Sequence, residues 1–498
     1  MDLVVVSNRV ARAKVNEPMT GGLAAALLPV VEKSGAIWVG SSGRVRDNVS
    51  KDSFAEIESL GAGALALLDL PAAHYGGYYE GFANSALWPA LHSRTDLISV
   101  SQDNYQCYRE VNAFMARALM RFNKPTAAFW VQDYHFLTLG AEMRDLGVRN
   151  PLGFFLHTPW PARRVIAGVP HHRDLVESML AYDLIGFQTE DDCENFTTYL
   201  RAELGLEVQG GIVSSRFGTS RIGAFPIGID VEGFAAQAQR AASHPDVSRL
   251  RKSLHGERLA IGVDRVDYSK GLVNRISAFD RLFEIQPSLK RSVSLLQIAT
   301  PSRGGIEAYS NLQDELSKQV TEVNGRHGEV DWTPIRYLSK GFSQTVLAGF
   351  YRAAQVGVVT PLHDGMNLVA KEYVAAQNPI DPGVLVLSKF AGAANELDTA
   401  LLVNPHDIDG MARTIAAALS MPATERRMRW EAMMAKLRAG TIHNWFAEFI
   451  ETLETAHMAM GPSLLPSVVR PLRVAGGSSL GNGGMRDLSR FVPRPVAN

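Results

Sequence analysis

Two carboxylates lie eight residues apart in a stretch whose residue types suit the binding of phosphate and sugar groups. The stretch is Thr360 to Glu372, TPLHDGMNLVAKE, and its acids are Asp364 and Glu372. An apolar run at 356–359 predicts a buried strand before it, and a helical pattern begins within it. A loop that enters a helix presents unpaired backbone N–H groups, which can bind a phosphate or sugar hydroxyls. The alternative is a plain turn at Gly365 with two solvated acids.

Four basic residues follow predicted strands and could neutralise anionic ligands. Arg265 and Lys270 lie five residues apart in GVDRVDYSKG. This pair suits a diphosphate, because arginine offers a rigid fork of donors and lysine a mobile point charge. Arg9 and Arg303 follow two other strands and could bind a second anion. The alternatives are a solvated loop for the first pair, and surface ion pairs with nearby carboxylates for the second.

Other strand ends also carry polar residues, as expected if they surround a cleft. AFWVQDYH ends in Asp133 and His135, and GFFLHTPWP places His157 after another strand. His157 could be a catalytic base or a hydrogen-bond donor, although a histidine at a strand end is as often structural. The Gly21-Gly22 pair opens an apolar helical pattern, where it would let backbone approach a ligand or would simply close a turn.

Strand-like apolar runs alternate with helical patterns along most of the chain, which predicts α/β architecture with parallel sheets covered on both faces. The series pauses in a polar, alanine-rich segment near 229–245. We therefore expect two doubly wound, Rossmann-like domains, 1–232 and 233–440, that face one another across a ligand-binding cleft. A helix at about 441–458 is expected to pack back on the first domain. The tail 461–498, rich in Gly, Ser, Pro and Arg, is expected to be disordered.

The overall composition excludes several classes of protein. The chain has 498 residues, of which 46% are hydrophobic, and its formal net charge is −1 without long blocks of one sign. Binding to nucleic acid or to an anionic membrane is therefore not supported. The 2 cysteines are far apart, which excludes a disulfide framework or a cysteine zinc site. The start MDLVVVSNR is not a signal peptide, and no apolar run could span a bilayer, so we expect a cytoplasmic protein.

A series of motifs follows along the chain in a characteristic order: VVVSNR followed by GG, QDYH, FFLHTPWP, FPIGID, VDRVDYSKG, TPSRG and HDGMNLVAKEYVAAQ. In order and spacing this series resembles the trehalose-6-phosphate synthases, retaining glycosyltransferases with the two-Rossmann GT-B fold. The resemblance runs from about residue 3 to about residue 458. It implies transfer of glucose from a nucleoside diphosphate glucose, with UDP-glucose expected, to glucose 6-phosphate. The product would be α,α-trehalose 6-phosphate.

The resemblance also implies roles for individual residues. Arg265 and Lys270 would hold the donor diphosphate, Asp364 with His157 the donor sugar, and Glu372 the ribose hydroxyls. These roles make Arg265, Lys270, His157 and Asp364 the implied catalytic set. The implied donor site comprises Gly21, Gly22, Arg265, Lys270, Phe342, Asp364, Leu368, Val369 and Glu372. The implied acceptor site comprises Arg9, Tyr79, Trp88, Asp133 and Arg303.

One position departs from the family pattern. Many relatives read W-x-G-W-S-G where this chain has WVGSSG from Trp38 to Gly43, so Ser41 replaces the second tryptophan. If that aromatic lines the acceptor site, the acceptor could differ. The alternatives are therefore a sibling transferase with another phosphorylated acceptor, such as glycerol 3-phosphate, or a non-catalytic sugar-phosphate-sensing subunit. The presence of the donor residues argues against the sensing subunit.

The expected ligands are small molecules, namely the sugar nucleotide and glucose 6-phosphate. The fingerprints of nicotinamide binding and of the P-loop are missing, so we expect no cofactor. Magnesium can accompany the donor diphosphate in solution, but the motifs contain no dedicated metal site. Backbone contacts at Phe342 would leave no side-chain signature of the base, so the sequence does not distinguish UDP from GDP or ADP. We expect a homo-oligomer, although no motif specifies the oligomeric state.

Overall fold

The computed structural model describes residues 2–10, 22–47 and 56–459. These ranges form two α/β sheets built mainly from parallel strands, which confirms the predicted fold class. Both sheets belong to one compact unit, Met1–Pro462. The predicted disordered tail, 461–498, lies outside the described residues.

The first sheet has ten strands in the order β3-β4-β2-β1-β5-β6-β7-β10-β9-β8. The seven central strands of this order, from β4 to β10 in space, pair in parallel. Strand β3 at one edge and strands β9 and β8 at the other edge are antiparallel. The strand bounds are β1 Asp2–Arg9, β2 Ile37–Arg46, β3 Glu56–Leu60, β4 Gly63–Pro71, β5 Ala127–Gln132, β6 Leu152–Phe155, β7 Leu184–Phe187, β8 Val208–Gln209, β9 Ile212–Ser215 and β10 Gly218–Ala224.

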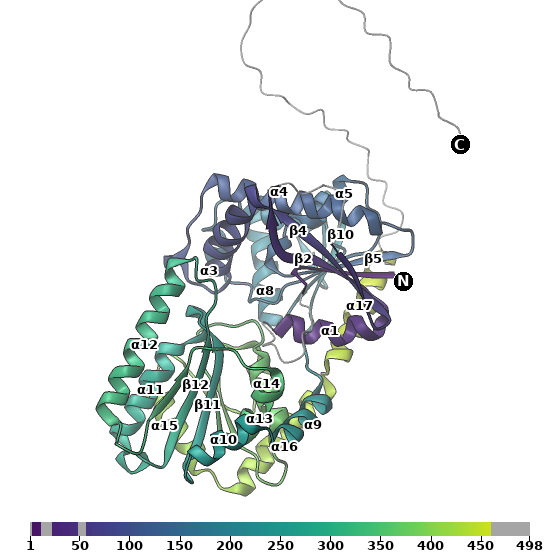
Figure 1. Ribbon diagram of the computed structural model, residues 1–498. Helices are drawn as coiled ribbons and strands as arrows, with labels where there is room; N and C mark the ends of the chain where they lie inside the picture. The colour runs from purple at the N-terminus through teal and green to yellow at the C-terminus, as the bar shows by residue number, and fades with distance from the viewer. Residues whose placement is uncertain (1, 11–21, 48–55, 460–498) are drawn as a thin grey trace, which may run out of the picture. The chain divides into compact units, whose positions relative to one another are not determined.

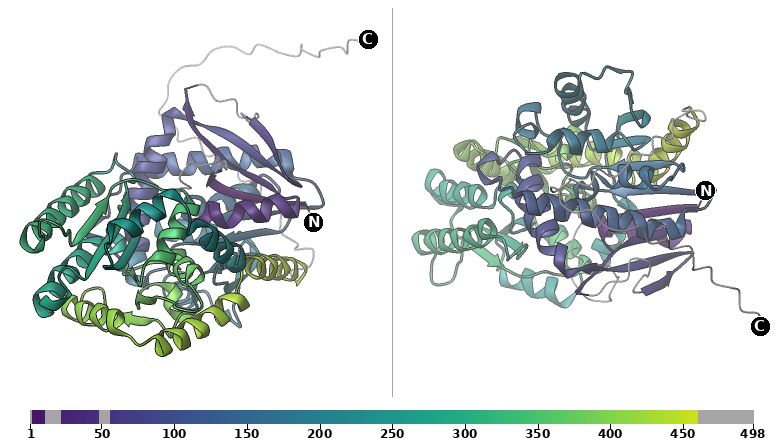
Figure 2. Two further views of the ribbon diagram at one scale, coloured as in Figure 1. Left: turned by 60° about the horizontal axis from the view of Figure 1, so that its bottom comes forward. Right: turned by 90° about the horizontal axis from the view of Figure 1, so that it is seen from above.

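Alternating apolar residues of these strands pack against helices on both faces of the first sheet (Figure 2). In β1, Leu3 and Val5 belong to a core that includes α1, whereas Val4 and Val6 belong to a core that includes α4. The bounds of the longer helices are α1 Gly22–Ser34, α4 Gln102–Leu119, α5 Leu139–Asp145, α7 His172–Met179 and α8 Glu190–Tyr199. The shorter turns are α2 Ala72–Tyr75, η1 Gly76–Leu87, α3 Trp88–Leu91, η2 Thr95–Leu97, η3 Met120–Phe122, η4 Tyr134–Phe136, α6 Arg163–Ile166 and η5 Leu200–Leu204.

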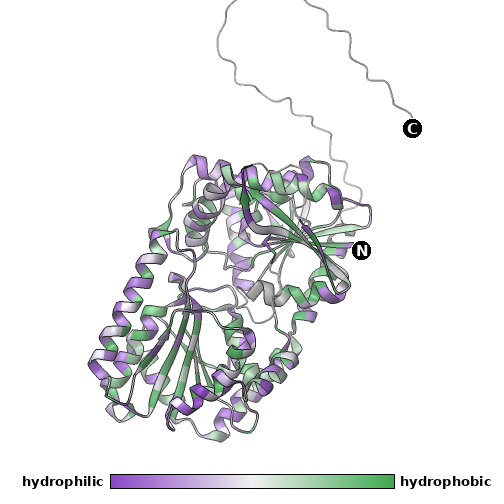
Figure 3. Cartoon of the chain, viewed as in Figure 1, coloured by the Kyte–Doolittle hydropathy of each residue, from purple (hydrophilic) through white to green (hydrophobic). Residues whose placement is uncertain are grey.

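The second sheet has six strands, all parallel, in the order β13-β12-β11-β14-β15-β16. Its strands are short apolar runs, and they form the predominantly hydrophobic interior visible in Figure 3. Their bounds are β11 Arg258–Arg265, β12 Val293–Thr300, β13 Ile335–Leu338, β14 Val356–Val359, β15 Val384–Ser388 and β16 Leu401–Val403.

Helices α11 and α12 cover one face of the second sheet, and α13 and α14 cover the other (Figure 1). The helices of this half are α10 Pro245–Ser253, α11 Leu272–Ile285, α12 Glu307–His327, α13 Gln344–Ala353, α14 Leu368–Ala376, α15 Ile408–Ser420 and α16 Ala423–Ala439. The shorter turns are η6 Tyr268–Lys270, η7 Pro287–Leu289 and η8 Gly392–Asn395.

The segment between the two sheets differs from the predicted pause in regular structure. It forms helix α9, Val231–Ala241, which is capped by the side chain of Asp230. Phe234 and Ala238 are buried on one side of the helix. The large apolar residues of this segment do lie at helical spacing. They were not recognised as a helical pattern because the residues around them are mostly alanine and polar.

The chain passes between the sheets twice, and the two passages lie side by side. The backbone N–H of Ile442 donates to the carbonyl of Ile229 at 3.2 Å. A Cβ atom at Gly228 would lie 2.1 Å from the carbonyl oxygen of Gly440, so this approach requires a glycine. After the second passage, helix α17, Ile442–Ala459, returns to strands β6 and β7 of the first sheet.

Glycines in the first sheet make room for α17. A Cβ atom at Gly153 or at Gly186 would come within 2.8 Å of the Phe449 ring. The Phe449 ring also stacks on Trp130, with 4.7 Å between the ring centroids. None of the helices in the three described ranges has both the length and the apolar character that a membrane span requires.

Candidate active site

The loop between β14 and α14 forms as the sequence predicts. Strand β14 ends at Val359, and helix α14 begins at Leu368. Asn367 is the N-cap, with φ of +74°, and its side chain accepts a hydrogen bond from the backbone N–H of Ala370 at 3.3 Å. The loop therefore leads directly into a capped helix start.

Gly365 brings this loop against the first sheet. A Cβ atom at Gly365 would lie 2.1 Å from the carbonyl oxygen of His157, the second residue after β6. No side chain fits at that distance. The glycine is therefore required for the contact between strand ends of the two sheets. The alternative, in which Gly365 serves only to form a turn, does not explain this close approach.

Lys270 and Asp364 form the central ion pair of the site. The Lys270 Nζ atom lies 2.5 Å from the Asp364 Oδ2 atom, and each side chain is only 13% exposed. The Asn367 side chain donates to the same carboxylate oxygen at 2.9 Å. Burial alone would raise the pKa of Asp364. The ion pair with Lys270, with smaller effects of His92 and of the hydrogen bond from Asn367, holds that pKa below its ordinary value. The carboxyl group is therefore ionised.

Backbone contacts between two loops bring this pair together. The N–H of Leu362 donates to the carbonyl of Ser269 at 2.7 Å. Gly271, with φ of +62°, allows the η6 turn to lie against Thr360, because a Cβ atom there would be 2.2 Å from the Thr360 carbonyl oxygen. Lys270 is the last residue of that turn, so its side chain reaches the β14–α14 loop.

The predicted cations Arg265 and Lys270 lie at the end of β11 and in the η6 turn that follows it, and they have different partners. Arg265 is the last residue of β11, and its side chain is 40% exposed. Its guanidinium carbon lies 5.7 Å from the ring centroid of Trp88, and its Nη2 atom lies 4.0 Å from Asp267. The alternative of a merely solvated loop is wrong for Lys270, which is engaged by Asp364.

His157 is a neutral histidine. Burial lowers its pKa to about 3, so its ring is uncharged at neutral pH. Its Nε2 atom lies 2.9 Å from the Oε1 atom of Gln132. Because an amide oxygen only accepts, Nε2 carries the proton and Nδ1 keeps its lone pair. The ring is therefore held in one orientation, which suits a hydrogen-bonding role.

Glu372 lines a cavity of about 210 Å³. Leu368, Gln344 and Asp230 line the same cavity, which places helices α9, α13 and α14 around it. Burial alone raises the pKa of Glu372 to about 7. The carboxyl group thus changes its charge near neutral pH.

The other predicted donor residues occupy the start of α13 and of α14. Leu368 and Val369 form the first turn of α14 and are partly buried against the core. Phe342 precedes α13, and its ring packs edge-on against Phe350 at a centroid distance of 5.3 Å. Gly22 is the first residue of α1, whereas Gly21 lies outside the described residues.

Arg303 is buried at the boundary between the two sheets. Its side chain is 6% exposed, and its guanidinium carbon lies 3.8 Å from the ring centroid of Trp88. Its Nη2 atom donates to the Tyr134 hydroxyl at 3.1 Å, and its Nη1 atom lies 3.2 Å from Asp267. It does pair with a carboxylate, but the alternative of an ion pair at the surface is wrong because both groups are buried.

Tyr79 belongs to an aromatic stack, and the charge of Arg9 acts on one member of that stack. The Tyr79 ring stacks on His135 at 5.9 Å and on Tyr75 at 5.5 Å. The pKa of Tyr75 is raised, chiefly by burial, and the charge of Arg9 opposes that rise. Arg9, the last residue of β1, is thus close enough to this stack to act on it electrostatically.

Asp133 follows β5 with φ of +76°. Its Oδ1 atom accepts a hydrogen bond from the backbone N–H of His157 at 3.3 Å, which ties it to the neighbouring strand end. Burial raises the pKa of Asp133 to about 6, and Arg303 and Arg265 oppose that shift. The two arginines thus exert their charge on an acid that follows a strand of the first sheet.

Ser41, the departure from the family pattern, is 4% exposed. Its hydroxyl accepts a hydrogen bond from the backbone N–H of Gly43 at 3.0 Å. Arg9 fills the space above that turn, because a Cβ atom at Gly43 would lie 2.8 Å from the Arg9 guanidinium. The serine therefore stabilises the strand that supports Arg9.

Three residues of the site were not predicted from the sequence. Asp267 contacts Arg303, Gln132 orients His157, and Asn367 donates to Asp364. Asp267 and Asn367 lie inside the motifs VDRVDYSKG and HDGMNLVAKEYVAAQ. Gln132 is likewise the first residue of the motif QDYH, so a place in the motifs was a usable signal for all three residues.

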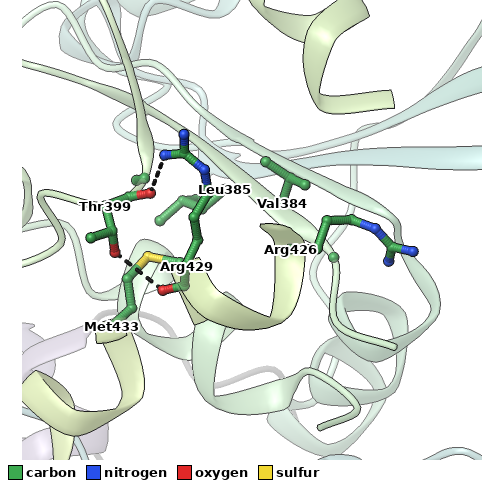
Figure 4. Close-up of a pocket in the computed structure, with 8 residues that line it drawn as sticks. Val384, Leu385, Thr399, Arg426, Arg429 and Met433 are labelled. Carbon is green, nitrogen blue, oxygen red and sulfur yellow. Dashed lines mark hydrogen bonds between the residues drawn. The ribbon is translucent and has the colours of Figure 1, made fainter. Parts of the chain in front are cut away.

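A second cavity, drawn in Figure 4, lies apart from these residues between β15 and α16. Arg429 and Thr399 close it with two hydrogen bonds of 3.0 and 3.1 Å, and it leaves no room for a water-sized molecule. It is therefore a packing gap.

No group of three or more His, Cys, Asp or Glu side chains in the described part of the chain could hold a metal ion.

Two parallel α/β sheets whose strand ends bring cations and carboxylates together are the architecture of a two-Rossmann glycosyltransferase. The chain belongs to glycosyltransferase family 20, whose sequence model matches residues 3–455. It is therefore a glycosyltransferase, as its resemblance to the trehalose-6-phosphate synthases implied.

The sequence of this chain aligns with curated relatives over nearly their whole length. The trehalose-6-phosphate synthase of Sinorhizobium fredii is 44% identical over 456 residues, which cover 91% of this chain and 98% of the relative. The trehalose-6-phosphate synthase of an Enterobacter species is 41% identical, with 91% and 95% covered.

Solved structures of similar proteins share the fold. A UDP-forming α,α-trehalose-phosphate synthase from Burkholderia xenovorans, in complex with glucose 6-phosphate, has a TM-score of 0.88 at 42% identity, and 91% of this chain and 100% of that chain are covered. An Escherichia coli structure bound with UDP-2-fluoro glucose has a TM-score of 0.85 at 37% identity, with 91% and 99% covered.

Proposed function

We propose that this chain is a retaining glucosyltransferase that transfers glucose from UDP-glucose to glucose 6-phosphate and forms α,α-trehalose 6-phosphate. The Lys270–Asp364 ion pair beside the His157 strand end carries this assignment. It offers a cation for a diphosphate and a carboxylate for sugar hydroxyls at one place. The ligands named for the Burkholderia xenovorans and Escherichia coli structures support the same pair of substrates.

The donor is assigned to the second sheet. Arg265 and Lys270 bind its diphosphate together with the backbone at the start of α14, where N–H groups are unpaired. Asp364 and His157 bind hydroxyls of the glucose, and the Glu372 carboxylate accepts the ribose hydroxyls. Backbone beside Phe342 faces the base, and Gly22 approaches the diphosphate from the first sheet.

The acceptor is assigned to the boundary between the sheets. Arg9 and Arg303 bind the phosphate of glucose 6-phosphate, for which guanidinium groups offer paired donors. Tyr79 supplies an aromatic face for the sugar, and Asp133 accepts from the sugar hydroxyls. Trp88 shapes the pocket through its contact with Arg303. The burial of Arg303 against the Trp88 ring supports this assignment, because phosphate binding to a desolvated cation is strong.

In the proposed reaction, the bond between C1 of the donor glucose and the diphosphate oxygen breaks. A bond forms on the same face between C1 and O1 of glucose 6-phosphate, and the proton of that hydroxyl passes to the departing diphosphate. Arg265 and Lys270 stabilise the charge that develops on the leaving group. The carboxylates of the donor site, Asp364 and Glu372, are assigned to hydroxyls of the glucose and of the ribose, so the proposed route forms no covalent enzyme intermediate.

An assay of purified protein with UDP-, GDP- and ADP-glucose tests the donor, and NMR identifies the product. We expect α,α-trehalose 6-phosphate, with UDP-glucose the best donor. A parallel reaction offers glycerol 3-phosphate in competition with glucose 6-phosphate. Preferential glucosylation of glycerol 3-phosphate would contradict the proposed acceptor and favour the sibling transferase, and release of no nucleoside diphosphate in a single turnover would favour a sensing subunit.

A further inference from the structure

Asp267 is a fully buried carboxylate between strand β11 and the η6 turn. Its Oδ2 atom lies 3.2 Å from Nη1 of Arg303 and 4.0 Å from Nη2 of Arg265. Its Oδ1 atom accepts hydrogen bonds from the backbone N–H of Ser269 at 3.1 Å and from the Trp88 indole at 3.4 Å. One carboxylate thus meets an arginine assigned to the donor and an arginine assigned to the acceptor.

The charge of Asp267 is retained despite its burial. Burial would raise its pKa, but the surrounding cationic groups, chiefly Arg303 and then Arg265, together hold the pKa below its ordinary value. The carboxylate is therefore a fixed anion between two cations. A buried anion of this kind orients its partners strongly, because water does not screen the interaction.

The same residues span the boundary between the sheets. Asp267 and Arg303 come from the second sheet, whereas Trp88 and Tyr134 come from the first. Arg303 contacts Tyr134 with one nitrogen and Asp267 with another, and its planar group lies over the Trp88 ring. The Trp88 indole in turn donates to Asp267, so the contacts form a closed ring across the boundary.

We infer that Asp267 is a positioning residue that holds Arg265 and Arg303 in a fixed relation, so that the donor diphosphate and the acceptor phosphate are bound at the separation that transfer requires. This role rests on the proposed function, because it needs both arginines to bind phosphates. Asp267 itself touches neither substrate in this arrangement. Its loss should therefore affect the alignment of bound substrates more than their affinity.

The variant D267N separates charge from shape. Asparagine keeps the size of the side chain and can still accept from Ser269 and Trp88, but it lacks the negative charge. We expect kcat to fall about 10²-fold, the cost of a small misplacement of reacting groups. Dissociation constants of UDP and of glucose 6-phosphate, measured by calorimetry, should stay within about threefold or become tighter, because both arginines keep their charge.

The variant D280N is the matched control. Asp280 also pairs with an arginine, Arg326, and with His327, but it lies on helix α11 among residues that have no role in the proposed site. We expect its kcat to remain within about twofold of the original chain, a range that corresponds to a small barrier change. Loss of activity in D280N equal to that in D267N would overturn the positioning role.

A second variant, D267E, keeps the charge and moves it by one methylene group, and it serves if D267N does not fold. We expect kcat to fall while both ligands still bind. The inference is overturned if D267E and D267N both turn over at the original rate, or if kcat and both affinities fall in parallel. If the unmodified chain transfers no glucose to glucose 6-phosphate, the proposed function itself fails, so the two failures are distinguishable.

Discussion

Lys270 and Asp364 lie 94 positions apart in the chain, yet their charged atoms are 2.5 Å apart in a site where each side chain is 13% exposed. The pair joins the β11–α11 segment to the β14–α14 loop. In the proposed function, a diphosphate that binds Lys270 would compete with Asp364 for it, and the released carboxylate would then be available to sugar hydroxyls. The proposal therefore links donor binding to sugar recognition through one ion pair.

Replacement of Lys270 by alanine should lower kcat by about 10² to 10³-fold, because removal of one group that stabilises a developing charge has that effect. The KM for glucose 6-phosphate should change much less, since Lys270 is assigned to the donor. Steady-state kinetics with each substrate varied will measure both. Lys318→Ala, at an exposed lysine on α12, is the control and should behave as the unmodified chain. Near-normal turnover in Lys270→Ala would remove Lys270 from the mechanism.

Donor affinity should depend on pH through Glu372, whose pKa is raised to about 7 by burial. The carboxylate accepts ribose hydroxyls better than the protonated acid does, so the KM for UDP-glucose should fall as pH rises from about 6 to 8. Glu372→Gln should abolish that dependence. A pH profile of KM that is the same in both proteins would contradict the assignment of Glu372.

Glu372 should also make the free energy of unfolding depend on pH, with stability falling as pH rises while donor affinity increases. The pKa of Glu372 in the folded chain, about 7, exceeds the ordinary value of 4.5, so the folded state binds more protons between these pH values. This contribution to stability is present at low pH and is lost as pH rises through 7. Urea denaturation at pH 5 and pH 8 should show a smaller difference for Glu372→Gln than for the unmodified chain. An equal difference would mean that Glu372 does not titrate there.

Gly365→Ala should destabilise the chain by about 1–3 kcal/mol, as expected for forced overpacking, and should also lower kcat. The added Cβ atom would lie 2.1 Å from the His157 carbonyl oxygen and would separate the two strand ends. Gly325→Ala on α12, where nothing lies within 4 Å, is the matched control and should be neutral or slightly stabilising. Equal behaviour of the two variants in denaturation and kinetics would show that the close approach is unimportant.

Removal of divalent metal with EDTA should leave kcat within about twofold, a change that corresponds to a small difference in barrier. The reason is that, in the proposed reaction, Arg265 and Lys270 would provide the positive charge that a bound metal ion could otherwise provide at the leaving diphosphate. An activity that EDTA abolishes and magnesium restores would contradict this expectation.

The expected homo-oligomer stays a prediction, which light scattering on the purified protein can test.

The sequence predicted those parts of the fold that local chemistry determines. The β14–α14 unit was recognisable because an apolar run is followed by chain-breaking residues and then by a helical pattern. The edge strands β3, β8 and β9 were missed because they are short and partly exposed, so they lack a continuous apolar run. Strand β4 was missed because its alanine and leucine residues also suit a helix.

The candidate site was predictable as a set of residue types, but its pairings were not. Arg265 and Lys270 were recognisable as neighbouring cations after a strand. That Lys270 meets Asp364, whereas Arg265 lies near Asp267, depends on how two distant loops hydrogen-bond through Leu362. Such contacts arise from the tertiary arrangement of strand ends, on which the local sequence carries no information.

The most direct test is an NMR time course of UDP-glucose and glucose 6-phosphate with the purified protein in one tube. We expect UDP and a disaccharide phosphate to appear in equal amounts, and both anomeric carbons of the product to have the α configuration. A β configuration at the carbon derived from UDP-glucose, or release of UDP with free glucose alone, would contradict retaining transfer to glucose 6-phosphate.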